Sequence, residues 1–467
     1  MKHILVLPFP LSGHVIPMLN LCCKLASRGI GQITLLINED CVETVEKLHE
    51  ELVARGDLSK EVVFTVESIP VTWPPAFRGS AEQIECLSRA IDGTGKFAEE
   101  VAIRALQSTS VPPVSFLLSD FGLWWSQDLA NKLGVPRILL SIIGFQEFGI
   151  ILQMPRLISQ GIYNPFAETE DDDLENKLIE VPGFPAFRAS EIPRISQFPD
   201  ALKCYWDALM RYMTRAREAK LILVNSCYEL EGEAYDATLR IHKLPIHLAG
   251  PLLASPLDSV ATSDCLKWLD TIRSPRSVLF SSFGTFLQLP SSELEEILFG
   301  IEASGQSFLL AFRTDVVVGD PSPTLLSFLD RYKEPQSDPR SKQRGLIVPW
   351  APQREVLLHG SVGGFFTHFG WNSVLESLAA GVPMIGKPIV GDQVGNRRLA
   401  VDRWKVALEI PEDDEKKLRK EAVEATVREL FSNEKLRANA ARLGKSLEEI
   451  VQENGCAYKC WDMVAKI

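Results

Sequence analysis

Short apolar runs alternate with longer amphipathic stretches along most of the chain, and this alternation limits the possible folds more than any other feature. The apolar runs are about four to six residues long and lack the apolar–polar alternation of a half-exposed strand, which indicates burial on both faces. Strands that alternate with helices in this way predict parallel sheets covered by helices.

The predicted strands form two series. The first comprises residues 3–7, 33–37, 62–66, 115–119, 137–141 and 221–225, and the second 278–282, 308–312, 346–348, 363–367, 383–385 and 406–410. A single core rarely exceeds about 250–300 residues, so a chain of 467 residues is expected to form two doubly wound α/β domains. The expected ranges are 1–245 and 246–437, with a Pro- and Ser-rich linker near 245–260 and a helical tail at 438–467.

The overall charge restricts the partners of the chain. It has 49 Lys and Arg against 61 Asp and Glu, a formal net charge of −12, which argues against nucleic acid or an anionic membrane as a general partner. A bound anion must therefore be held locally. Nine scattered cysteines and no apolar run long enough to span a bilayer predict a cytoplasmic protein with free thiols.

Two polar residues follow predicted strands of the first series. His14 lies between Gly13 and a helix that Pro17 is expected to help start, and a helix N-terminus favours a neutral imidazole that can accept a proton. Asp120 ends a strand of the same sheet and could orient that imidazole. Alternatively, His14 caps the helix or packs at the sheet edge, and Asp120 is the N-cap of a helix near Trp124.

The region 350–393 carries a strand, a tight turn and a helix that Gly381 ends. Backbone N–H groups at the helix start, with the side chains of Asn372 and Ser373, would form an anion site suited to a pyrophosphate. Ser373 and Glu376 could instead form a capping box that needs no ligand. Trp350 could be a core residue or a flat platform for a base.

The segment from Trp350 to Gln393 resembles the signature box of plant family 1 UDP-sugar-dependent glycosyltransferases, from Trp-Ala-Pro-Gln to Asp-Gln. The resemblance extends to PFPLSGHVIPMLNL at residues 8–21, to the Asp120 region and to VLFSSFGT at 278–285. Phe369 is a departure, since the family often has Cys or Gly there. The resemblance implies two facing Rossmann-like domains, the GT-B-type architecture, with helices 438–467 packing back on the first.

The resemblance also implies contacts for the donor. Trp350 would stack on uracil beside the Ala351 backbone and Gln353, and Glu376 would hold the ribose hydroxyls. The pyrophosphate would contact Ser282, Thr285, His368, Asn372 and Ser373. The sugar would contact Trp371, Asp392 and Gln393. A closing Gln together with Trp371 is associated with glucose in this family, so UDP-glucose is the expected donor.

The implied mechanism is direct displacement at the anomeric carbon with inversion, in which His14, oriented by Asp120, deprotonates the acceptor hydroxyl. Helix N–H groups and His368 would supply the positive potential for the leaving phosphate, with no metal and no permanently bound cofactor. The Asp-x-Asp match at Asp171–Asp173 is interpreted as part of a solvated acidic loop.

Aromatic residues of the first domain suggest a small apolar acceptor, phenolic or flavonoid-like, as in plant secondary metabolism. These residues are Phe9, Phe121, Trp125, Phe145 and Phe148. The alternative, expected for at least half of the five, is that they pack in the core. The protein is expected to be a monomer. A UDP-sugar epimerase or hydrolase and a non-catalytic binder are the alternative functions. A nicotinamide-dependent enzyme is disfavoured because no G-x-G-x-x-G motif follows a predicted strand, and GTGK at 93–96 lacks the other residues of a phosphate-binding loop.

Overall fold

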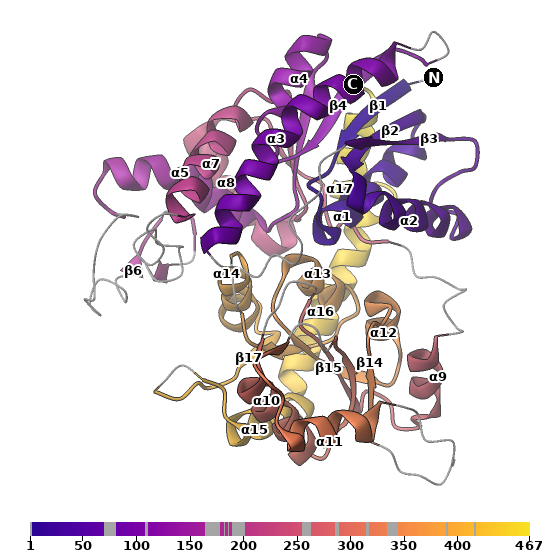
Figure 1. Ribbon diagram of the computed structural model, residues 1–467. Coiled ribbons are helices and arrows are strands. Elements are labelled where there is room, and N and C mark those ends of the chain that lie inside the picture. Colours follow the sequence, from indigo (N-terminus) through magenta and orange to yellow (C-terminus); the bar gives the residue numbers. More distant parts are fainter. Residues whose placement is uncertain are drawn as a thin grey trace. The chain divides into compact units, whose positions relative to one another are not determined.

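The computed structural model describes residues 2–69, 81–107, 111–163, 178–181, 183–184, 186–188, 201–254, 263–284, 289–313, 317–333, 344–388, 391–414 and 417–467. The chain divides into two compact units, Met1–Ser255 with Glu449–Ile467, and Pro256–Glu448. Each unit contains one large parallel sheet flanked by helices (Figure 1). The predicted α/β class with two doubly wound sheets is confirmed.

The sheet of the first unit has seven parallel strands in the order β3-β2-β1-β4-β5-β8-β9. The strands are β1 Lys2–Leu7, β2 Ile30–Asn38, β3 Val63–Ile69, β4 Val114–Asp120, β5 Arg137–Ser141, β8 Leu221–Val224 and β9 Ile246–Leu248. The strand order reverses between β1 and β4, which is where ligands bind in open sheets of this kind. The six predicted strands of this half are present, and β9 adds a seventh that pairs with β8.

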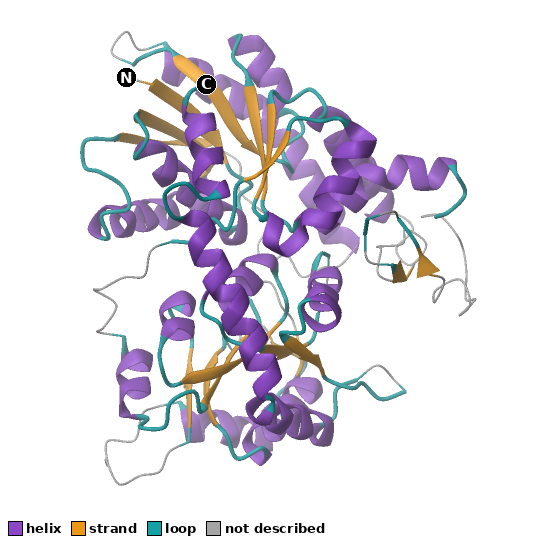
Figure 2. Cartoon of the chain, turned by 180° about the vertical axis from the view of Figure 1, so that it is seen from behind, coloured by secondary structure: helices purple, strands orange, loops and turns teal. Residues whose placement is uncertain are grey.

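Helices cover both faces of this sheet (Figure 2). Ile4 and Val6 of β1 point to one face, and Leu5 and Leu7 point to the other, which explains why the strand is apolar throughout. The first face is covered by α1 Ser12–Ala26, α2 Val42–Ala54 and α17 Cys456–Ala465. The second is covered by α3 Ala81–Leu106, α4 Ser126–Leu133, α5 Phe145–Ser159, α7 Ala201–Ala216 and α8 Tyr228–His242. A short 3-10 turn, η1 Glu39–Cys41, precedes α2. A separate two-stranded antiparallel sheet is formed by β6 Leu178–Ile179 and β7 Phe187–Arg188.

Helix α1 begins earlier than predicted. It starts at Ser12 after the N-cap residue Leu11, and Pro17 lies inside it, whereas the sequence placed Pro17 near the start. His14 therefore belongs to the first turn of the helix.

The C-terminal helix α17 is part of the first unit. The indole Nε1 of Trp461 donates a hydrogen bond of 2.8 Å to the Ala249 carbonyl, and Trp461 is 2% exposed. The Arg28 guanidinium lies 4.0 Å from the centre of the Tyr458 ring and bonds Asp462 at 2.6 Å. These contacts attach the last helix to the turn after α1 and to the segment after β9.

The sheet of the second unit has six parallel strands in the order β14-β12-β10-β15-β16-β17. They are β10 Val278–Ser282, β12 Ser307–Ala311, β14 Gly345–Val348, β15 Val362–Thr367, β16 Met384–Gly386 and β17 Ala407–Glu409. Each corresponds to a predicted strand. The order reverses between β10 and β15, so the residues after these two strands lie where a ligand is expected. A separate parallel pair is formed by β11 Leu289–Pro290 and β13 Val317–Val318.

Four helices of this unit pack on strand residues such as Leu279, Phe366 and Ile385 to form its main core. They are α10 Ser291–Ala303, α11 Pro323–Tyr332, α15 Lys420–Ser432 and the start of α16 Glu434–Val451. The other helical elements are α9 Asp264–Thr271, α12 Gln353–Leu358, α13 Trp371–Ala379, α14 Gln393–Arg398 and the π-helical turn Leu399–Arg403. Over the described parts of both units, no helix is long and apolar enough to cross a membrane.

Candidate active site

His14 and Asp120 are in direct contact in the first unit. Strands β1 and β4 are parallel neighbours, so the helix that follows β1 starts at the same sheet edge at which Asp120 ends β4. His14 Nδ1 lies 2.9 Å from Asp120 Oδ2. The side chain of Asp120 is fully buried and that of His14 is 23% exposed. The structure brings the two predicted residues together, and their catalytic role stays a prediction.

The Asp120 carboxylate is held at both oxygens. Its Oδ1 accepts a hydrogen bond of 2.8 Å from the Gly122 backbone N–H. Helix α4 begins only at Ser126, with Trp125 as its N-cap residue, so the alternative in which Asp120 caps this helix is wrong. A Cβ at position 122 would lie 3.2 Å from that carboxylate oxygen and 3.0 Å from Phe9, which favours glycine there.

The hydrogen bond to Asp120 determines the tautomer of His14. A carboxylate only accepts hydrogen bonds, so His14 Nδ1 carries the proton and donates it to Asp120. The Nε2 atom is then left with a lone pair that can take a proton from a substrate hydroxyl. The ring of Phe9 lies 4.8 Å from the imidazole centre, tilted by 35°, and packs against one side of the ring.

The aromatic residues expected around an acceptor are mostly core residues. Phe145 and Phe148 are fully buried and pack on each other with ring centres 6.2 Å apart. Phe121 is partly buried and makes an edge contact with Phe148. Phe9 and Trp125 are buried as well. The alternative of core packing therefore describes four of the five residues, all but Phe121, and Trp125 in addition lines a pocket.

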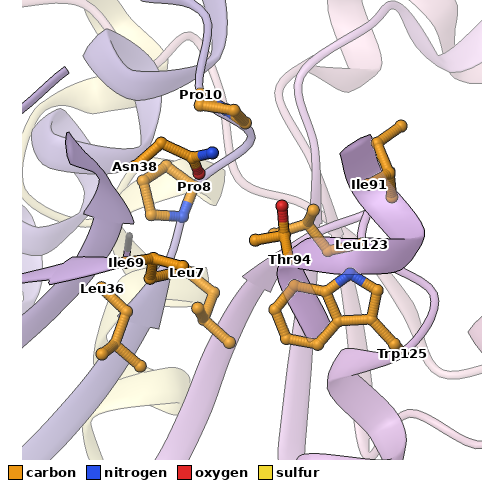
Figure 3. A pocket seen from close by; sticks show the side chains of 10 residues that line it. All are labelled: Leu7, Pro8, Pro10, Leu36, Asn38, Ile69, Ile91, Thr94, Leu123 and Trp125. Carbon is orange, nitrogen blue, oxygen red and sulfur yellow. The ribbon is translucent and has the colours of Figure 1, made fainter. Parts of the chain in front are cut away.

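A small pocket lies at the carboxyl ends of the first strands of this unit (Figure 3). Its volume is about 10 Å³, about the space that one water molecule needs. The buried indole Nε1 of Trp125 has no hydrogen-bond partner among the described residues. A Cβ at Gly95 would lie 2.9 Å from Trp125 Cγ, so the GTGK segment is explained by close packing of Trp125 on α3. The pocket is lined by Leu7, Pro8, Pro10, Leu36, Asn38, Ile69, Ile91, Thr94, Leu123 and Trp125.

In the second unit, the turns after β10 and β15 are neighbours. Ser282 and Thr367 are paired in register at the ends of these strands. His368 follows Thr367, and a Cβ at Gly284 or Gly370 would lie 2.9 Å or 2.5 Å from His368 Nε2. Two glycines thus allow the backbone to approach both sides of the imidazole. Ser282 has a partly buried position at the strand end, and Thr285 lies outside the described residues.

His368 is uncharged at neutral pH. Burial lowers its pKa to about 4, although a hydrogen bond to the Ser282 backbone favours the charged form. Its Nδ1 atom has no hydrogen-bond partner among the described residues. The structure does not support the expectation that His368 adds positive potential, because desolvation disfavours the protonated ring. The single N–H of the neutral ring is used by the hydrogen bond to the Ser282 backbone.

The start of helix α13 offers backbone N–H groups to an anion. Gly370 is its N-cap residue, and among the described residues no side-chain hydrogen bond caps the helix. Asn372 and Ser373 lie in the first turn, so Ser373 is inside the helix and the capping-box alternative with Glu376 is wrong. Uncapped N–H groups and the helix dipole favour a phosphate at this position.

Gln353 connects the first turn of α13 to Glu376. Its Nε2 atom donates hydrogen bonds of 3.0 Å to Ser373 Oγ and 2.7 Å to Glu376 Oε2. Burial raises the pKa of Glu376 above its usual range, and the hydrogen bond from Gln353 opposes that shift. The carboxylate is thus positioned to accept hydrogen bonds from hydroxyl groups.

Trp350 and Trp371 have opposite environments. Trp350 is 70% exposed on the loop before α12, next to the buried Ala351, so Trp350 is no core residue and its ring is available for stacking. Trp371 is 3% exposed, with its ring 6.2 Å from that of Trp404. Its side chain therefore presents little surface to a ligand, which restricts its predicted role as a sugar contact.

Asp392 and Gln393 lie at the start of α14, where Asp392 is the N-cap residue. Asn396, which the sequence reasoning missed, donates a hydrogen bond of 2.8 Å to Asp392 Oδ2. The only sequence signal for it is an Asn one helical turn after the Asp. In the described ranges, no three His, Cys, Asp or Glu residues are grouped to hold a metal ion, and Asp171–Asp173 lie outside those ranges.

The comparisons with known proteins agree with this geometry. Residues 268–449 match a family model described as UDP-glucoronosyl and UDP-glucosyl transferase. UDP-glycosyltransferase 85A7 of Arabidopsis thaliana is 31% identical over 97% of this chain and 91% of its own length. The 7-deoxyloganetin glucosyltransferase of Gardenia jasminoides is 30% identical over 97% of this chain and 94% of its own length.

A solved structure supports the same fold. The Phytolacca americana protein UGT2, in complex with UDP-2fluoro-glucose and pterostilbene, superposes with a TM-score of 0.79 and 27% sequence identity. The alignment covers 100% of this chain and 99% of that protein.

Proposed function

The chain belongs to the plant family 1 UDP-glycosyltransferases, enzymes that transfer a sugar to small-molecule acceptors, and on that premise we propose that it moves glucose from UDP-glucose to a hydroxyl of a small apolar acceptor with inversion. A phenolic or flavonoid-like molecule is the proposed acceptor. The observation that carries the proposal is the hydrogen bond between His14 and the buried Asp120.

His14 is the proposed general base. Its Nε2 takes the proton of the acceptor hydroxyl, and the oxygen attacks the anomeric carbon of glucose. The bond from that carbon to the phosphate oxygen breaks, and UDP leaves with its electron pair. Asp120 keeps the imidazole in the required tautomer and stabilises the imidazolium that forms.

The donor is proposed to bind the second unit. The exposed ring of Trp350 stacks on uracil beside Ala351, and Glu376, held by Gln353, accepts hydrogen bonds from the ribose hydroxyls. The N–H groups at the start of α13 donate to the pyrophosphate, and the neutral imidazole of His368 lies in the turn just before that helix. The group proposed around the phosphates also includes Ser282, Thr285, Asn372 and Ser373.

Glucose is proposed as the sugar because the chain has Asp392 and Gln393 at the end of the signature box. Two names among the similar proteins agree with this: one relative is a glucosyltransferase, and the Phytolacca protein was solved with a fluorinated UDP-glucose. We propose that residues 1–245 bind the acceptor and residues 246–437 bind the donor, and that residues 438–467 pack on the first domain. We also propose a monomer that works in the cytoplasm without a metal.

A UDP-release assay with UDP-glucose and a panel of phenols tests this function. The wild-type protein should release UDP only when an acceptor is present, and His14→Ala should lose several orders of magnitude in turnover with little change in UDP-glucose affinity. His359→Ala is a matched control, since His359 also contacts an aspartate, Asp270, at 3.1 Å, and should retain wild-type turnover.

Other outcomes would reject specific parts of the proposal. Equal UDP release without an acceptor would identify a hydrolase, and tight binding without turnover a binder. Faster turnover with UDP-galactose than with UDP-glucose would refute the donor assignment.

A further inference from the structure

Asn396 joins two parts of the second unit that are distant in sequence. It lies in α14 and is 2% exposed. Its side-chain Nδ2 donates one hydrogen bond of 2.9 Å to the Phe369 carbonyl and another of 2.8 Å to Asp392 Oδ2. The first acceptor is in the turn after β15, and the second is the proposed sugar contact at the start of α14.

The turn at Phe369 needs external support. Phe369 has a φ of 62°, in the left-handed region that favours glycine, and its side chain is fully buried. A bulky residue in this conformation is strained and persists only where its surroundings hold it. The Phe369 N–H donates to Thr367 Oγ1 at 3.3 Å, and the carbonyl accepts from Asn396. Both the N–H and the carbonyl of Phe369 are therefore hydrogen-bonded to side chains.

An asparagine suits this position better than its close analogues. The amide Nδ2 has two N–H groups, and each has one acceptor, so both donors are used. Aspartate would place a second carboxylate beside Asp392 and would present an acceptor to the Phe369 carbonyl. An aliphatic residue would leave a buried carbonyl without its donor, which is unfavourable.

We propose that Asn396 is a positioning residue that sets the Asp392 carboxylate for the sugar and ties it to the phosphate-binding turn at His368–Gly370. The inference rests on the proposed function, because it takes Asp392 as a contact of the transferred glucose. Its consequence is that loss of the Asn396 amide weakens the handling of the sugar more than the binding of the nucleotide.

The test compares UDP, which lacks the sugar, with UDP-glucose. For Asn396→Ala we expect kcat/KM for UDP-glucose to fall at least tenfold, a loss carried mainly by kcat, while the dissociation constant for UDP measured by calorimetry changes less than threefold. Asn396→Ser leaves a smaller cavity and serves as the second variant if the alanine protein does not fold. A merely structural role would weaken UDP binding, sugar transfer and the melting temperature together, and that result would overturn the inference.

Asn439→Ala is a matched control. Asn439 Nδ2 donates 3.0 Å to the carbonyl of Lys405, which is also a left-handed non-glycine residue, with a φ of 54°. This variant removes an amide-to-carbonyl bond whose acceptor is Lys405 and that does not involve Asp392, so it should keep its kcat. If it loses kcat as Asn396→Ala does, the specific role of Asn396 is refuted.

The variant Asp392→Asn, alone and combined with Asn396→Ala, distinguishes the role of Asn396 from the role of Asp392 as a sugar contact. If Asn396 acts through Asp392, the double variant should be hardly worse than Asp392→Asn alone. If Asp392→Asn impairs glucose transfer and Asn396→Ala does not, the inference fails and the proposed function stands. If Asp392→Asn leaves glucose transfer unchanged, the assignment of Asp392 to the sugar fails and the inference fails with it.

Discussion

Replacement of Asp120 by asparagine should disable the proposed base by reversing the tautomer of His14. Asp120 Oδ1 accepts the Gly122 N–H, so the amide oxygen of the new residue would keep that position and its NH₂ group would face His14 Nδ1. His14 would then have to accept at Nδ1 and carry its proton on Nε2, where the acceptor hydroxyl needs a lone pair.

The expected loss follows from the charge that is removed. With Nδ1 and Oδ2 2.9 Å apart, the charge centres of an imidazolium and the carboxylate lie about 4 Å apart, which is worth about 4 kcal/mol at an effective dielectric constant of about 20. At about 1.4 kcal/mol per factor of ten, the transition state loses about three orders of magnitude in rate. Affinity for UDP-glucose should change little, because Asp120 lies in the first unit.

Steady-state turnover on two phenols of different acidity is the decisive measurement. The more acidic phenol needs less help from a base, so Asp120→Asn should impair its glucosylation less. Ser119→Ala is the control, since Ser119 precedes Asp120 on β4, is equally buried and lies 3.0 Å from Ser126 Oγ. The reasoning is refuted if Asp120→Asn keeps turnover within tenfold of the wild type on both phenols.

Three further predictions concern nucleotide binding and stability. Because burial raises the pKa of Glu376, binding of UDP-glucose should weaken as the pH falls through that raised value, earlier than for an ordinary Glu. Calorimetry with UDP-glucose from pH 7.5 to 5 should show this, and Glu376→Gln should bind about 10–100-fold more weakly without that dependence. Gly284→Ala puts a Cβ 2.9 Å from the His368 ring at a φ of 77°, so the UDP-glucose dissociation constant should rise, and an unchanged constant would contradict the close approach. Trp461→Phe removes the hydrogen bond to Ala249 and should lower the free energy of unfolding by about 1–3 kcal/mol in denaturant titrations, with an unchanged midpoint as the contrary result.

The arrangement of strands could be predicted because each buried strand is a continuous apolar run, and all twelve predicted strands are present. Strand β9 was missed because its three residues, Ile246–Leu248, are followed closely by Gly250 and Pro251, which the composition rules assign to a linker. The start of α1 was placed too late for a similar reason: Pro is favoured in the first turn, and Pro17 is deeper in the helix.

The strand-end rule placed His14 and Asp120 correctly at one sheet edge, because that rule depends only on strand order. The bridging role of Gln353 and the contact between Asn396 and Phe369 could not be predicted. These contacts join residues 20 or more positions apart, and such side-chain geometry has no periodic signal in the sequence. The uncharged state of His368 likewise depends on burial, which a motif does not report.

The neutral imidazole of His368 has a consequence for how the proposed phosphate site responds to ionic strength. The attraction between separated ions weakens as salt is added, with a screening length of about 8 Å at physiological concentrations. Hydrogen bonds from backbone N–H groups act at contact distance, well inside that length, and an uncharged His368 ring adds no long-range attraction between ions. A nucleotide held in this way should therefore lose little affinity in concentrated electrolyte.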